Sequence, residues 1–226
     1  MTTGQVPAGS NLLVEYDPAS QWYNAALTIA AGWLKGRGTV DYNASVESPA
    51  QVRLKLNGLG VNVEEHEKEG RLELWDVYTV LLGRKSDEKF VGSLGGLKVS
   101  EASIAFAKEE MSLPIAPDML RIADDLSYLD RFNDEKNWLE FVVSRVFPAA
   151  ALRKITAIRG FMKGVHSEKA YSRLEGAADG IIDFKLEELG EEAKNLMRIR
   201  SMRNVGFDSR WHPLKINENF EVILEK

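Results

Sequence analysis

The sequence predicts an α/β protein, with a mostly parallel sheet flanked by helices and an antiparallel extension at the C-terminal end. Two observations carry this prediction. Apolar strand patterns alternate with helix patterns from residue 11 to about residue 184. Beyond that point, short strand patterns follow one another with only turns between them. The first arrangement is typical of a parallel sheet and the second of antiparallel strands.

Length, charge and composition limit the possible functions. The chain has 226 residues, and we expect residues 1–9 to be a flexible lead-in to a single domain at 10–226. The formal net charge of −5 does not favour nucleic acid as a partner. The absence of cysteine excludes disulfides, thiol catalysis and Cys-based zinc sites. No apolar stretch reaches the roughly 18 residues of a membrane helix, and no signal peptide is recognisable, so we expect no membrane contact and a cytoplasmic location.

The first element, from Asn11 to Leu34, is the most informative. Residues 12–14 form an apolar strand, Asp17 and Pro18 form a tight turn, and a helix rich in alanine follows. Strand, turn and helix in this order are the setting of a phosphate-binding loop (P-loop). Such a loop uses glycines to bring backbone N–H groups onto phosphate oxygens. It also supplies a Lys to the phosphates and a Ser or Thr to Mg²⁺.

The turn has the register of a G-D-P-G-S-G-K-T loop but few of its residues. Trp22 stands at the Lys position and Tyr23 at the Ser/Thr position. Either the loop has lost its phosphate chemistry, or this is an ordinary strand–turn–helix whose turn never bound a ligand. The other positions of the turn are Tyr16, Ala19 and Gln21 in place of glycines, with Asp17, Pro18 and Ser20 kept.

The middle of the chain continues the alternation of strands and helices. Residues 39–43 have a short strand pattern. Ser48 and Pro49 begin a helix, because Ser caps helices and Pro suits their first turn. We expect that helix to end at Gly58 and Gly60. The further predictions are a charged, solvated connection at 64–70, a strand at 71–78, a mobile polar loop at 83–96 and a helix at about 100–111.

The second half begins with a strand at 119–125 that ends in Asp124 and Asp125. Asp134 then caps an apolar helix that extends to about Phe147. The remaining predictions are a strand at 155–158, a polar loop at 159–168, a helix to about 178, a strand at 180–184, and strands at 196–202, 211–216 and 220–224 joined by turns at 204–208 and 217–219.

Four segments together carry a family resemblance. They are the turn at 16–23, S-V-E-S-P-A-Q-V at 45–52, L-R-I-A-D-D-L-S at 120–127, and the run from L-E-G-A-A-D-G-I-I at 174–182 to Met202 and Arg203. In this order and spacing they resemble the KaiC-like branch of the RecA superfamily of P-loop ATPases, from about Ser10 to the C-terminus. The resemblance implies a RecA-like fold. The segment at 120–127 is similar to the family's Walker B strand.

The resemblance also implies which residues would carry ATP hydrolysis, and several of them are replaced. The P-loop Lys and Thr positions hold Trp22 and Tyr23, so the Walker A loop is degenerate. The first of a pair of catalytic glutamates is Val46, and a Lys that reaches the neighbouring subunit's nucleotide is Ser201. The positions that are kept are Glu47, the Walker B Asp124 and Arg203.

Two groups near the turn are candidate ligand contacts. Trp22 and Tyr23 form either an aromatic platform for a planar ligand or a plug that fills the vacated pocket, and we favour the plug. Glu47 and Asp124 are candidate ligand or cation contacts at the carboxyl edge of the sheet, where open α/β sheets bind their ligands. No two histidines stand at metal-ligand spacing, so no metal site is predicted.

Basic residues near the C-terminus are candidate intersubunit contacts. Arg198 and Arg200 share one face of a predicted strand, and the resemblance places them, with Arg203, at a subunit boundary. The alternative is a solvated strand face. The loop around His166 is a possible contact surface for a partner, with a solvated loop that Ser167 caps as the favoured interpretation.

These observations lead to one functional prediction and one alternative. The prediction is a catalytically inactive KaiC/RecA-like domain that acts as a regulatory or interaction module, without a cofactor. The resemblance implies a homo-oligomer, or a hetero-oligomer with a related ATPase. The alternative is a protein that binds a nucleotide or another anion, with ATP and Mg²⁺ as its ligands and little or no hydrolysis.

Overall fold

The structure is a computed structural model, and it describes residues 2–92, 118–190 and 192–225. The strands in this part of the chain are β1 (Asn11–Tyr16), β2 (Thr39–Ala44), β3 (Leu72–Asp76), β4 (Phe90–Val91), β5 (Met119–Ala123), β6 (Thr156–Met162), β7 (Gly180–Leu189), β8 (Glu192–Met202), β9 (His212–Ile216) and β10 (Val222–Leu224). The helices are α1 (Trp22–Lys35), α2 (Pro49–Gly58), α3 (Val63–Lys68), α4 (Tyr78–Leu81), η1 (Ser127–Arg131), α7 (Glu135–Phe141), η2 (Val142–Val146), α8 (Phe147–Leu152) and α9 (Glu168–Ala177).

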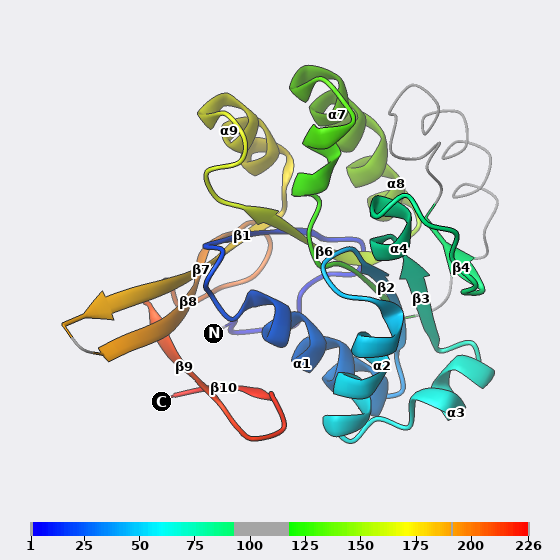
Figure 1. The fold of residues 1–226 in the computed structure, drawn as a ribbon. Coiled ribbons are helices and arrows are strands. Elements are labelled where there is room, and N and C mark those ends of the chain that lie inside the picture. Colours follow the sequence, from blue (N-terminus) through cyan, green and yellow to red (C-terminus); the bar gives the residue numbers. More distant parts are fainter. Residues whose placement is uncertain (1, 93–117, 191, 226) are drawn as a thin grey trace.

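The described strands form one sheet in the order β10-β9-β8-β7-β1-β6-β5-β2-β3-β4. Neighbours from β7 to β4 are parallel. The strands β8, β9 and β10 are added antiparallel beyond β7. The predicted fold class, a mostly parallel sheet with an antiparallel C-terminal extension, is confirmed. Helices α1 to α3 cover one face of the sheet and α7 to α9 the other (Figure 1).

Each face of the sheet has its own apolar core, because successive side chains of a strand point to opposite faces. In β1, Leu12 and Val14 belong to the core under α1 and α2, whereas Leu13 belongs to the core under α7 and α9. The strand is buried along its whole length. A central parallel strand is therefore apolar on both sides, as the sequence pattern indicated.

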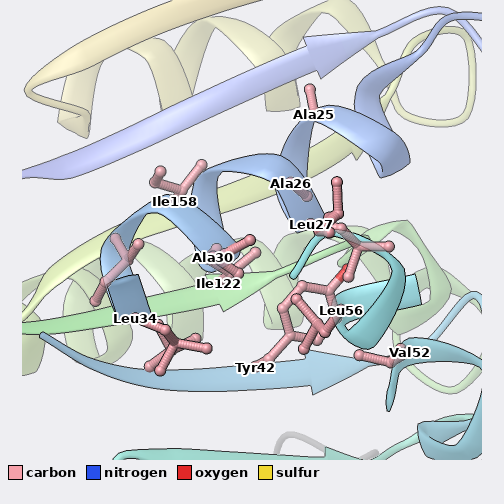
Figure 2. Packing of buried hydrophobic residues seen from close by; sticks show 14 of the residues in the cluster. Ala25, Ala26, Leu27, Ala30, Leu34, Tyr42, Val52, Leu56, Ile122 and Ile158 are labelled. Atoms are coloured by element: carbon pink, nitrogen blue, oxygen red, sulfur yellow. The ribbon is translucent and has the colours of Figure 1, made fainter. Parts of the chain in front are cut away.

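Helix α1 packs closely on the sheet because its inner face is built from alanine. Ala26 and Ala30 are fully buried and lie next to the strands that carry Tyr42, Ile122 and Ile158 (Figure 2). Leu34 closes the last turn and is 1% exposed. This close packing fixes the direction of α1 across the sheet.

The helix starts that the sequence predicts are confirmed. The Ser48 hydroxyl accepts a hydrogen bond from the Gln51 N–H, with Pro49 in the first turn of α2. Asp134 caps α7, and Ser167 caps α9. The apolar helix after Asp134 continues through the π-helical segment η2 into α8. None of the described helices is both long and apolar enough to cross a membrane.

The prediction of a charged, solvated connection at 64–70 is wrong, since most of this segment forms helix α3. Asn62 caps this helix by accepting a hydrogen bond from the Glu65 N–H, and two acids stand in its first turn. Val63 and His66 face inward, at 3% and 8% exposure. These two are the only buried side chains of the helix, so the run of charges concealed its apolar side.

The predicted polar loop at 159–168 begins too early, because β6 continues to Met162. Arg159 is only 2% exposed, and its guanidinium donates to Asn11 Oδ1 at 2.6 Å and lies over the Phe147 ring. Within the predicted loop at 83–96, Phe90 and Val91 form the edge strand β4. Residues 93–96 and the predicted helix at 100–111 lie outside the described residues.

A charged network ties the antiparallel extension to β1 and α9. Arg200 on β8 lies 2.7 Å from Glu15 on β1 and 2.9 Å from Glu175 on α9. Its Nε is 3.4 Å from Asp183 on β7. Arg200 is the extra residue of a β-bulge, which turns its side chain toward β1. Burial raises the pKa of Glu15 from its ordinary 4.5 to about 7, and Arg200 acts in the opposite direction.

This raised pKa predicts a pH dependence of stability. Between about pH 4.5 and pH 7 the folded protein keeps a proton on Glu15 that the unfolded chain releases. The contribution is fully present below pH 4.5 and is lost as the pH rises through 7. Relative to Glu15→Gln, the unfolding free energy of the wild type should fall over this interval by on the order of 2 kcal/mol. Urea unfolding at several pH values measures it.

The control variant is Glu140→Gln, which removes an exposed carboxylate from the surface of α7. Its stability curve should run parallel to that of the wild type. Parallel curves for Glu15→Gln and the wild type would show that Glu15 titrates normally in the folded protein.

Candidate functional site

The turn at 16–23 lies at the carboxyl end of β1, where the sheet delivers the chain to α1. The Asp17 N–H donates to the Phe184 carbonyl, and the Ser20 N–H donates to the Asp17 carbonyl. Pro18 and Ala19 are exposed at the tip. Gln21 stands at the helix N-cap without a side-chain cap. The turn is therefore held by its own backbone and by β7.

Trp22 begins α1 and is fully buried. Its indole Nε1 donates to the Asp124 carbonyl at 2.6 Å. The ring packs against Phe184 at 5.5 Å and Tyr16 at 6.3 Å between centroids. With no exposed face, the indole offers no platform to a planar ligand. Trp22 links α1 to β1, β5 and β7 instead.

Gly160 on β6 makes room for this arrangement. A Cβ at position 160 would come within 2.5 Å of the Trp22 Nε1 and 2.3 Å of the Asp124 carbonyl oxygen. Any larger residue would collide with backbone as well as with the indole. The role of Gly160 was not predicted, because the sequence pattern placed this position in a loop. A glycine directly after an apolar strand pattern was the signal that could have identified it.

Tyr23 pairs with Tyr16 rather than facing solvent freely. Their hydroxyls are 2.7 Å apart and their rings meet edge to face at 5.3 Å. Burial, and then the charge of Asp125, raises the pKa of Tyr16 well above its ordinary value. Burial also raises the pKa of Tyr23, so both hydroxyls stay protonated at neutral pH.

Asp124 at the end of β5 is 2% exposed and accepts hydrogen bonds from the segment after β2. Its donors are the Ser45 N–H at 3.0 Å, the Ser45 hydroxyl at 2.5 Å and the Asp125 N–H at 2.8 Å. Burial nevertheless raises the pKa of Asp124 to about 7. Its carboxylate therefore connects β5 to the segment after β2, which the sequence alone did not indicate.

Glu47 has a different partner, the Lys55 ammonium on α2. The described residues hold no group of three or more His, Cys, Asp or Glu side chains that could bind a metal ion. Asp125 bonds the Ser127 N–H, and Asp130 is exposed. A cation held by Glu47 and Asp124 stays a prediction.

The segment after β6 borders the turn at 16–23. Lys163 Nζ lies 3.6 Å from Asp17 and 3.8 Å from Asp183, so it bridges the turn and β7. No motif in the sequence indicated a role for this lysine. His166 is 9% exposed and is surrounded by the rings of Trp138, Phe161 and Tyr171. Burial lowers the pKa of His166. Its imidazole therefore lies within the core under α7 and α9, not on a contact surface.

The three candidate intersubunit arginines lie on or beside the network around Glu15. Arg198 donates to Asp183 at 2.8 Å and stacks on Trp211. Arg200 contacts Glu15, Glu175 and Asp183 as described above. Arg203 is exposed and donates to the Gly176 carbonyl at 2.6 Å. Arg198 and Arg200 lie on the same face of β8, as predicted, and both form ion pairs with carboxylates of their own chain. Their intersubunit role stays a prediction.

Comparison with known proteins connects this geometry to a family. The model of the KaiC ATPase domain matches residues 34–226. The match begins in the last turn of α1, so the turn at 16–23 precedes it. Two curated relatives are UPF0273 proteins. One, from Thermotoga maritima, is 24% identical over 198 residues, which is 80% of this chain and 74% of the relative. The other, from Methanopyrus kandleri, is 27% identical over 175 residues, which is 76% of this chain and 67% of the relative.

Solved structures show the same fold at low sequence identity. A KaiC-like protein from Pyrococcus horikoshii OT3 superimposes with a TM-score of 0.69 at 16% identity, over 100% of this chain and 93% of that one. The flagellar accessory protein FlaH from Methanocaldococcus jannaschii superimposes with a TM-score of 0.72 at 16% identity, over 99% of this chain and 92% of that one. The RecA-like fold is thereby confirmed, and the chain belongs to the KaiC family of ATPase domains.

Proposed function

We propose that this chain is a catalytically inactive member of the KaiC family that acts as a regulatory or interaction module. The observation that carries the proposal is the buried indole of Trp22 at the position of the P-loop lysine. Its Nε1 already donates to the Asp124 carbonyl, and its ring is packed between Tyr16 and Phe184. A side chain so enclosed supplies no charge to a phosphate.

The other replacements also argue against ATP hydrolysis. Catalysis by P-loop enzymes consists almost entirely of positioning and electrostatic stabilisation of phosphate oxygens. Losing one stabilising group commonly costs about 3 kcal/mol in the transition state. Here the lysine, the Mg²⁺-binding hydroxyl and one glutamate are replaced together, by Trp22, Tyr23 and Val46. These residues do not fit ATP with Mg²⁺ as the family would hold it.

The proposed interaction role draws on what the chain keeps. The sheet, its helices and the segment that carries Arg203 are retained although the P-loop residues are not. Arg203 is exposed at the end of β8, at the position that the family resemblance assigns to a subunit boundary. We infer a homo-oligomer, or a hetero-oligomer with a related active ATPase, in the cytoplasm.

One observation favours a second candidate, a protein that binds a nucleotide or another anion without turnover. Helix α1 has no side-chain cap at its N-terminus, where Gln21 is the N-cap residue. The Ser20 hydroxyl is buried there, at 7% exposure, and has no hydrogen-bond partner among the described residues. Helix N-termini with free N–H groups attract anions.

Thermal unfolding distinguishes the two candidates. For the inactive module, millimolar ATP with Mg²⁺ should leave the melting temperature unchanged. Anion binding would instead stabilise the protein by about 2.7 kcal/mol at about 100 times the Kd. In that case Ser20→Ala should abolish the shift, and Ser172→Ala on the exposed face of α9 should preserve it. A saturable shift that Ser20→Ala removes would replace the first candidate by the second.

Substituting the P-loop lysine for Trp22 tests the role of the indole. Trp22→Lys should lower the unfolding free energy by about 4 kcal/mol, because it removes a buried ring and buries a charge. Trp33→Lys is the control, since Trp33 lies half-buried on the same helix and should cost clearly less. Trp22→Lys should also show no ATP hydrolysis, because Tyr16, Ala19 and Gln21 still stand where a P-loop has glycines. Hydrolysis by the wild type that Asp124→Asn abolishes would refute the inactive assignment.

Self-association tests the interaction role. Light scattering should give a mass above the 25.3 kDa of one chain, either alone or after mixing with an active relative of the family. Arg203→Glu should weaken the association by about tenfold or more, as expected for reversing a charge at an interface. Arg210→Glu alters another exposed arginine, 82% exposed at its side chain, and should have little effect. A monomer under both conditions would count against an assembly role.

A further inference from the structure

The C-terminal hairpin formed by β9 and β10 carries an unusual number of exposed apolar side chains. Four of the ten large apolar side chains that are exposed in the described residues lie between positions 216 and 224. They are Ile216, Phe220, Ile223 and Leu224, at 36% to 54% exposure. Single exposed apolar residues are common, whereas a group of them indicates an interaction surface. We call these four residues the hairpin patch.

The hairpin is anchored to the rest of the domain on one side only. Val222 packs against the core under α1, and its N–H donates to the Thr28 hydroxyl at 3.0 Å. Ile216 stands opposite Val222 and points to the same face of the hairpin, whereas Ile223 stands opposite Lys215 and points to the other face. Exposed apolar side chains therefore lie on both faces of a hairpin that α1 holds in place.

Phe220 has a backbone conformation that bulky residues avoid. Its φ of 62° lies in the left-handed region, where a tight hairpin loop usually has glycine. Asn217 fixes the loop, because its Oδ1 accepts from the Asn219 and Glu221 N–H groups at 2.9 and 3.0 Å. Strained residues of this kind cluster at functional sites. The half-exposed Phe220 ring is thus presented on a rigid loop, which lowers the entropy cost of binding it.

Acidic side chains border the hairpin patch. Glu218 and Glu221 are exposed on the two sides of the loop, while Glu225 pairs with the Lys215 ammonium. If two hairpin patches met, the acids of one copy would face those of the other, and like charges at an interface weaken binding. The hairpin patch therefore fits an apolar surface with a basic border rather than another hairpin.

Helix α8 has a surface of this kind. Leu152 is the most exposed of the ten apolar side chains, at 70%, and Pro148 is exposed one helix turn earlier on the same face. The exposed cations Arg145 and Lys154 lie before and after these two residues. The sequence from 142 to 154 contains no acid. We call Arg145, Pro148, Leu152 and Lys154 the α8 patch.

We propose that the hairpin patch of one copy of this chain binds the α8 patch of a second copy. The Phe220 ring would pack on Leu152, and the acidic border of the hairpin would face the two cations. Within one chain the patches lie apart, because the hairpin packs on the α1 side at the end of the sheet, whereas α8 contacts β1 and β6 on the opposite face (Figure 1). Since the two surfaces differ, the contact is head-to-tail, and such contacts build rings or filaments.

Phe220→Gly separates binding from stability. Glycine adopts the left-handed conformation without strain, so the variant should melt no lower than the wild type. Its self-association should nevertheless be at least about tenfold weaker, as for the loss of an aromatic anchor. Phe132→Ala is the control, since it removes another exposed ring, at 38% exposure, and should leave self-association unchanged. Sedimentation velocity over a concentration series gives the dissociation constants.

Charge reversal tests which surfaces meet. Glu218→Lys combined with Glu221→Lys should weaken self-association about tenfold or more, and so should Arg145→Glu combined with Lys154→Glu. An equimolar mixture of these two double variants should associate again, because opposite charges then meet at every contact between unlike chains. Melting temperatures establish that each variant is folded.

Glu188→Lys and Lys169→Glu are the matched controls, because they reverse exposed charges on β7 and α9 and should have little effect. Loss of association on reversing the hairpin but not α8 would overturn the proposal, since the hairpin would then have another partner surface. A monomeric wild type would also overturn it. The inference rests on the proposed interaction role but fails separately. Association that Arg203→Glu weakens and Phe220→Gly leaves unchanged would support that role and refute the hairpin contact.

Discussion

The hydrogen bond from the Trp22 indole to the Asp124 carbonyl is the contact on which the carboxyl edge of the sheet depends. It joins the start of α1 to the end of β5, over a separation of 102 residues. The same indole packs on Tyr16 and Phe184, which brings β1 and β7 into the contact. Gly160 on β6 is required for the fit, because a Cβ there would overlap both the indole and the carbonyl oxygen. A bulky aromatic ring thus fills the space between the start of α1 and the central strands.

Around this contact, several charged groups have partners within the chain. Asp124 accepts hydrogen bonds from Ser45 and Asp125, Glu47 forms an ion pair with Lys55, and Arg200 forms ion pairs with Glu15, Glu175 and Asp183. Lys163 bridges Asp17 and Asp183. In an enzyme, groups at such an edge would be reserved for a ligand and would cost stability while free. Here each of these groups already has a partner within its own chain.

Local sequence signals predicted most of the fold because they act over a few residues. Ser48, Asp134 and Ser167 cap helices through bonds to N–H groups two or three residues away. The predictions failed where a distant partner overrides local polarity. Arg159 continues β6 because Asn11 and the Phe147 ring accept its buried guanidinium. Helix α3 was missed because only Val63 and His66 of its residues face inward.

The sequence by itself determined the fold class and the family resemblance, since each follows from residue type and order, and it predicted which residues stand at the P-loop positions. Only the tertiary structure decided what those residues do. Trp22 is enclosed rather than offered as a platform, Arg198 and Arg200 meet carboxylates of their own chain, and exposed apolar side chains gather on the hairpin of β9 and β10. The reason is physical: burial, ion pairing and pKa depend on which distant segments the sheet brings together, and no local pattern specifies that.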